Sequence, residues 1–117
     1  MVIVSSAAST GGGGLPADPV VITVGASADF GFSEEFAICD GVVVQGFVIG
    51  NIGGTGSGAN FLDTGGGADA PTMATRLQTA INASGLDVTV GVVGAVVTLT
   101  AGATGLLFQD NSTGLTV

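Results

Sequence analysis

The side chains of this chain that could do chemistry are almost all carboxylates. The nine are Asp18, Asp29, Glu34, Glu35, Asp40, Asp63, Asp69, Asp87 and Asp110. Paired carboxylates can hydrolyse a glycosidic bond, but Glu34 and Glu35 are adjacent and would face opposite sides of a strand. Asp63, Asp69 and Asp110 could meet near loops and bind Ca²⁺. We favour solvated turn residues instead, and predict no catalytic pair and no metal site.

Most other side chains that catalysis uses are missing. The chain has no His, a single basic side chain, Arg76, and a single Cys, Cys39. Without His there is no Ser-His-Asp or Cys-His system, and without Lys there is no Schiff base. One Cys allows neither a disulfide nor a Cys-based zinc site. We therefore predict that the protein is not an enzyme and uses no cofactor.

Charge and composition favour a subunit of an assembly. The formal net charge is -8, which disfavours nucleic acid and anionic membranes as partners, because phosphate groups are bound by Lys and Arg. Only 9% of residues are charged, while 46% are hydrophobic. A free monomer usually carries charge on about a quarter of its residues. This composition is suited to a protein whose surface is buried against other subunits.

The N-terminus has no basic, apolar leader of the secretory type, so we expect synthesis in the cytoplasm. Cys39 follows Phe36, Ala37 and Ile38. A free thiol agrees with a reducing compartment, and in this apolar context we expect Cys39 to be buried as a small hydrophobic residue.

Residues 1–19 predict an extended N-terminal arm. Its β-branched tip, residues 2–4, precedes four consecutive glycines, residues 11–14, and a stretch with two prolines. Glycine runs are flexible and proline-rich stretches are extended. A free tail has no need of an apolar tip, so we expect the arm to pair with a neighbouring subunit.

Residues 20–117 predict a single β-rich domain. A β-branched run at 20–24 indicates a strand, and residues 36–49 indicate a hairpin that turns at Asp40 and Gly41. Further features are a glycine-rich loop at 50–58, short strands at 60–63, 106–108 and 114–117, and a hairpin of strands 88–92 and 96–100 that turns at Val93 and Gly94.

A single helix is predicted at about 70–84. Asp69 is a suitable cap, Pro71 fits the first turn and Gly85 ends the pattern. Arg76, Gln78 and Asn82 are expected to lie towards solvent. The predicted fold is therefore α+β and mostly β, with antiparallel sheets or a sandwich of short strands.

Several of these segments together resemble a pattern of tailed-bacteriophage virion proteins. They are the helix ATRLQTAINA at 74–83, the strand VTV at 88–90 and the stretch GAVVTLTAGATG at 94–105. The upstream hairpin at 36–49 also resembles that group, so the likeness covers roughly residues 30–115. The final loops depart from the pattern because they have almost no Lys or Asn.

The resemblance implies a virion structural protein, such as a small capsid decoration, or cement, protein. Such a protein would bind the outer surface of the phage head and stabilise contacts between major capsid subunits. Its partners would be the major capsid protein and copies of itself, with a homotrimer expected, and its location the capsid surface. The alternatives are a tail component, as tube subunit or fibre domain, and a cell-surface-binding β-domain.

The residues expected to bind these partners are Val2, Ile3, Val4, Leu15 and Arg76. Arg76 has two interpretations. It is either a helix-surface residue paired with a nearby carboxylate, or one side of an ion pair between subunits that sets their register.

Overall fold

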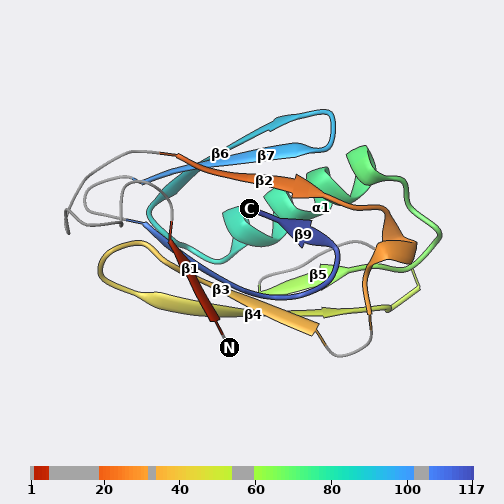
Figure 1. Ribbon diagram of the computed structural model, residues 1–117, viewed down its shortest axis with the longest axis horizontal. Helices are drawn as coiled ribbons and strands as arrows, with labels where there is room; N and C mark the ends of the chain where they lie inside the picture. Colours follow the sequence, from red (N-terminus) through yellow and green to blue (C-terminus); the bar gives the residue numbers. More distant parts are fainter. Residues whose placement is uncertain (1, 6–18, 32–33, 54–59, 102–105) are drawn as a thin grey trace.

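The predicted α+β architecture, mostly β, is present in the computed structural model, which describes residues 2–5, 19–31, 34–53, 60–101 and 106–117 (Figure 1). Two sheets face each other. Sheet A has the strand order β1 (Val2–Ser5), β8 (Leu107–Asn111), β3 (Glu34–Cys39), β4 (Val44–Gly50) and β5 (Phe61–Asp63). Sheet B has the order β6 (Val88–Val93), β7 (Val96–Ala101), β2 (Val20–Val24) and β9 (Leu115–Thr116).

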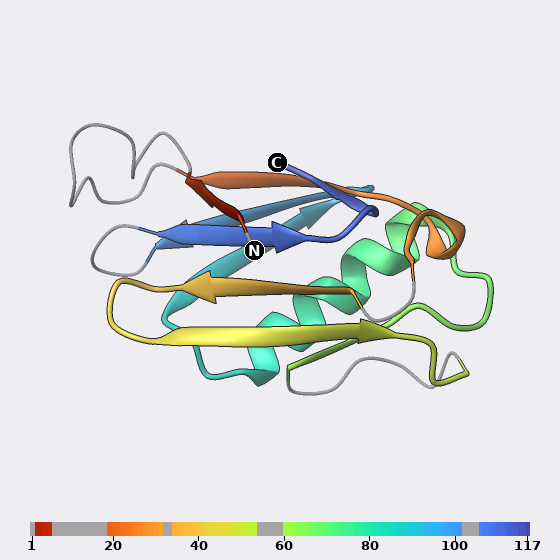
Figure 2. The same cartoon turned by 60° about the horizontal axis from the view of Figure 1, so that its bottom comes forward.

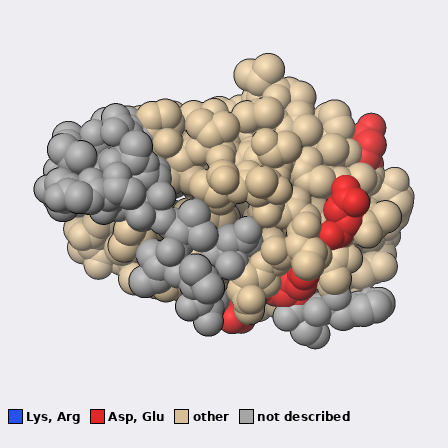
Figure 3. Space-filling view, in the orientation of Figure 1, with Lys and Arg blue, Asp and Glu red and all other residues tan. Residues whose placement is uncertain are grey.

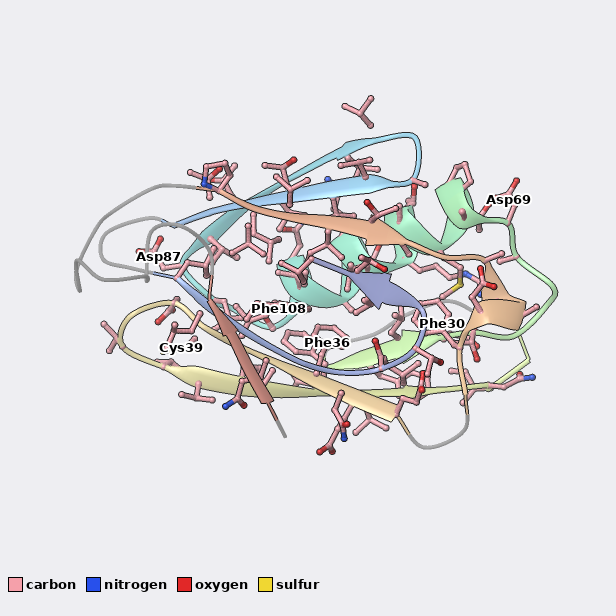
Figure 4. The ribbon with its side chains drawn as sticks, in the orientation of Figure 1. Phe30, Phe36, Cys39, Asp69, Asp87 and Phe108 are labelled. Carbon is pink, nitrogen blue, oxygen red and sulfur yellow. The ribbon has the colours of Figure 1, made fainter. Side chains whose placement is uncertain are left out.

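Alternation along the strands builds the core between the two sheets. In β2, every second residue is buried, and in β3 Phe36 and Ile38 point inward. The ring of Phe36 stacks on Phe47 at 4.6 Å and lies 5.6 Å from Phe108 (Figure 4). Burying each such ring stabilises the fold by about 1.5–3 kcal/mol.

The helix α1 (Ala70–Ala83) lies between the sheets and closes one side of the sandwich (Figure 2). Its cap is the predicted one: the Asp69 carboxylate accepts a hydrogen bond from Thr72 N–H at 2.9 Å. Gly85, with a φ of 80°, follows its end. Its buried residues, which contact β2, β5, β6 and β7, are Met73, Ala74, Leu77, Ala80 and Ile81.

Both hairpins form, but their turns differ from the prediction. Cys39 pairs with Val44, so the first hairpin has a four-residue loop, residues 40–43, instead of a two-residue turn. Inside this loop the Asp40 carboxylate accepts hydrogen bonds from Val42 N–H and Val43 N–H, so these donors are used by the loop itself, and Asp40 N–H donates to the carbonyl oxygen of Val43 at 3.1 Å. In the second hairpin Val93 pairs with Val96, so the turn lies one residue later than predicted.

One strand pairing is parallel. The short strand β5, predicted within 60–63, runs parallel to β4, with Val48 opposite Phe61 and Gly50 opposite Asp63. Every other pair in the two sheets, among the described strands, is antiparallel.

The tip of the N-terminal arm is a strand of sheet A in the same chain. Residues 2–5 form β1 and pair with β8, with Val2 opposite Asp110 and Ser5 opposite Leu107. Residues 6–18 of the arm and most of the glycine-rich loop, residues 54–59, lie outside the described residues.

Candidate functional site

Asp40 connects the two sheets through its carboxylate. Oδ1 accepts hydrogen bonds from Val42 N–H at 2.9 Å and Val43 N–H at 2.8 Å, which shape the β3–β4 loop. Oδ2 accepts a third from Asp87 N–H, at 3.0 Å, just before β6. These bonds, that of Val43 first, hold the pKa of the Asp40 carboxyl below its usual value. Asp40 is therefore a structural acceptor.

Glu34 plays a similar part at the other end of β3. Its carboxylate accepts hydrogen bonds from Gly31 N–H and from both the N–H and the hydroxyl of Thr113. The Thr113 hydroxyl also lies within hydrogen-bonding distance, 2.9 Å, of the Asp29 carbonyl oxygen. Burial alone would raise the pKa of Glu34, but the bonds from Thr113 and Gly31 outweigh it and hold this pKa below its usual value.

Asp63 and Arg76 organise the loop that leads from β5 to α1. Asp63 is fully buried, and its Oδ1 accepts from Ile52 N–H at 3.1 Å and Gly65 N–H at 2.8 Å. Arg76 Nη1 donates to the carbonyl oxygens of Asp63 and Gly65, both at 2.9 Å. The helical pattern predicted that Arg76 faces solvent. The guanidinium is instead partly buried against these loop carbonyls.

These carboxylates of the described chain hold loops and a helix cap in place. Asp69 caps α1, where hydrogen bonds from the Thr72 side chain and backbone lower its pKa. No group of three His, Cys, Asp or Glu side chains with metal-binding geometry occurs among the described residues.

The outer face of sheet B is the most unusual surface. None of the residues of β2, β6, β7 and β9 is charged. The outward positions alternate with buried ones, so this face presents valines and threonines. Val21 is 47% exposed and Val93 is 81% exposed. We call this surface the Val/Thr face: Val21, Thr23, Thr89, Gly91, Val93, Val96, Thr98, Thr100 and Thr116.

A second apolar surface lies on sheet A. Val44 and Val48 of β4 are 67% and 53% exposed, and Val42 in the adjoining loop is 86% exposed. Next to them is a hollow of about 120 Å³ on the outer face, lined by Ala37, Cys39, Val44, Leu107 and Gln109. Glu35 stands opposite Val48, so this surface has a charge at its border.

Carboxylates lie outside the strands of the Val/Thr face, and Asp87 directly precedes β6 at its border. In Figure 3 they lie along one end and the lower rim, while the surface over β2 and β9 is uncharged. Asp69 lies at that end, and Asp87 lies at the opposite end (Figure 4), where its N–H donates to Asp40, the residue after Cys39. Because the four strands of this face carry no charged side chain, a protein that covers them does not have to remove water from ions there.

The predicted partner-binding residues do not form one site. Val2, Ile3 and Val4 lie in β1, at one edge of sheet A. Arg76 binds the carbonyl oxygen of Asp63 in β5, at the opposite edge. Leu15 lies outside the described residues.

Besides Arg76, the expectations for two further side chains were wrong. Cys39 is half-buried instead of buried, because alternation along β3 points Ile38 inward and Cys39 outward. Gln78 does not simply face solvent, since its amide donates to the carbonyl oxygen of Val90 at 3.1 Å. That bond satisfies an acceptor of the edge strand β6.

Sequence reasoning missed the tie from Asp40 to Asp87 and the contacts of Glu34 with Thr113. An Asp before Gly signals a turn, but the partners lie 47 and 79 residues away in the sequence. No local pattern reveals such pairs.

No protein-family model, no curated protein and no solved structure matches this chain. In the described part of the chain, no helix is long and apolar enough to cross a membrane. A function must therefore be inferred from the surfaces of the protein itself.

Proposed function

We propose that this protein is a virion structural protein of a tailed phage: a capsid decoration protein that binds the outer surface of the head through the Val/Thr face. The observation that carries the proposal is that four strands of one sheet have no charged residue while the chain carries a net charge of -8. Extended uncharged surfaces on small proteins mark interaction sites.

The chemistry of the face suits a broad protein contact. Valine and threonine methyl groups bury apolar area, while threonine hydroxyls can form hydrogen bonds to a partner backbone. The β-branched side chains are stiff, so ordering them on binding costs little conformational entropy. A ligand that binds only the assembled shell stabilises that shell by mass action.

Binding to heads tests the proposal directly. Heads that lack the protein, purified from a phage whose genome encodes this sequence, would be mixed with it, sedimented and heated. We expect the protein to co-sediment and to raise the temperature at which the heads release DNA. If it neither binds heads nor changes that temperature, the proposal fails, and rings or tubes of the purified protein in negative stain would favour the tail alternative.

Variants of one residue locate the docking face. Val21→Asp and Val21→Lys each place a charge in the centre of the Val/Thr face, and both should abolish binding, because either charge would be buried without a partner. Val42→Asp is the matched control, since Val42 is exposed on the loop between strands β3 and β4 of sheet A. Retention of binding by both Val21 variants would show that sheet B does not dock.

A further inference from the structure

Strand β1 is attached to the fold through a single neighbour. It is the edge strand of sheet A, and within the described chain β8 is the one element against which it packs extensively. The pairing covers four residues, from Val2 opposite Asp110 to Ser5 opposite Leu107. A strand of four residues that pairs with one neighbour is released more easily than a central strand, and its departure bares the edge of β8.

The connection between β1 and β2 is longer than this position needs. Figures 1 and 2 both show the last residues of β1 at the same end of the molecule as the start of β2. Fourteen residues nevertheless separate Ser5 from Val20. Fully extended, they span about 50 Å. The molecule measures 41 × 24 × 22 Å, so β1 could reach the corresponding edge of an adjacent copy.

The best partner for a bared β8 is another β1. An open edge presents unpaired N–H and C=O groups that pair with any suitable strand. A second copy of β1 restores the same hydrogen bonds in the same register, so exchange changes few contacts and depends mainly on protein concentration. The sequence of β1, VIVS, is uncharged, so its pairing with β8 places no further charge beside Asp110, which lies opposite Val2.

We propose that β1 is exchanged between copies of this protein, so that the β1 strand of one copy pairs with β8 of the next with Ile3 opposite Gln109. The exchange links copies into a dimer when it is reciprocal, or into a closed ring such as the expected trimer when it runs around an axis. The proposal concerns self-association and does not depend on the virion role.

A mixed cross-linking experiment tests it. All variants carry Cys39→Ser, which removes the single native thiol. One partner carries Ile3→Cys and the other Gln109→Cys. Residues directly opposite in an antiparallel pair have Cα atoms about 4.5–5.5 Å apart, which suits a disulfide. After mixing and mild oxidation, we expect a disulfide-linked pair of the two variants on a non-reducing gel.

Two controls make every outcome decisive. Mixing the Ile3→Cys variant with Val42→Cys, whose thiol is on the exposed β3–β4 loop, measures random collision and should give little cross-linking. A chain with both Ile3→Cys and Gln109→Cys measures pairing within one copy. Circular dichroism against the Cys39→Ser parent checks that each variant folds.

Cross-linking to Gln109→Cys well above the Val42→Cys control supports exchange. An intramolecular disulfide in the double variant, with no linked pair in the mixture, would show that β1 stays with its own chain. No disulfide in either experiment would show that β1 does not occupy the edge of β8, and would also overturn the proposal. No phage heads are used, so failure here is separate from failure of head binding.

Discussion

At Asp40, one carboxylate accepts hydrogen bonds from three backbone N–H groups in two loops far apart in the sequence. The side chain is only 6% exposed, so a lost bond leaves a donor with poor access to water. These hydrogen bonds let Asp40 contribute to the stability of the fold. The hydrogen bonds from Thr113 to the Glu34 carboxylate also join distant segments, but both residues are more exposed than Asp40.

Asp40→Asn should destabilise the fold. The amide oxygen can still accept from Val42 and Val43, but the NH₂ group cannot accept from Asp87 N–H. We expect the free energy of unfolding to fall by about 1–3 kcal/mol, because a part-buried hydrogen bond to a charged acceptor is lost. Urea unfolding followed by far-ultraviolet circular dichroism measures it, since the chain has no Trp or Tyr.

Asp87→Asn is the matched control for that experiment. It makes the same change in charge, but Asp87 is exposed and contributes its backbone N–H to the tie, which the substitution keeps. Equal losses for the two variants would mean that charge, and not the hydrogen bond between the sheets, sets the effect.

The contribution of Asp40 should also depend on pH. Its pKa in the folded protein is lowered, so the carboxylate binds a proton less readily in the folded than in the unfolded chain, where the pKa is about 3.9. Its stabilisation is present above the unfolded pKa and is lost as pH falls through the folded pKa. The difference in unfolding free energy between wild type and Asp40→Asn should therefore be constant from pH 7 to about pH 5 and shrink below about pH 4. A difference that grows on acidification would contradict the lowered pKa.

Arg76 connects helix α1 to the end of strand β5 through two hydrogen bonds. Replacing it with Met keeps the length of the side chain but leaves the carbonyl oxygens of Asp63 and Gly65 without these bonds. We expect a loss of about 1–3 kcal/mol in the free energy of unfolding of the isolated chain. Arg76→Lys should recover part of it, because an ammonium donates from a single point and cannot reproduce the planar guanidinium. If neither variant changes stability, an intermolecular role for Arg76 becomes the better interpretation.

The elements that the sequence predicted well are those specified by neighbouring residues. The helix follows from Asp69, Pro71, its apolar spacing and Gly85, and the strands from alternation or β-branched runs. The parallel pairing of β5 and the pairing of β1 with β8 depend on partners distant in the sequence. Local patterns carry no information about such partners, which is why these features were missed.

The Val/Thr face could not be located from the sequence either. Each strand of sheet B is visibly uncharged in the sequence, but the Val/Thr face exists only because β2 lies between β7 and β9. That arrangement brings residues 20–24 beside residues 115–116. The low charge content alone indicated an assembly, whereas the location of the contact required the sheet order.

The dependence of self-association on salt concentration should distinguish an uncharged contact between copies from an ion pair made by Arg76. A chain with a net charge of -8 repels its copies, and an uncharged contact such as exchanged β1 strands has no ion pairs to lose. Raising NaCl from about 0.05 to 0.3 M shortens the range of repulsion, which is about 10 Å at 0.1 M. Sedimentation velocity should therefore show stronger self-association at the higher salt concentration. An ion pair from Arg76 to a carboxylate of the next subunit would be screened by the same salt, so weaker association would favour that pair and contradict an uncharged contact.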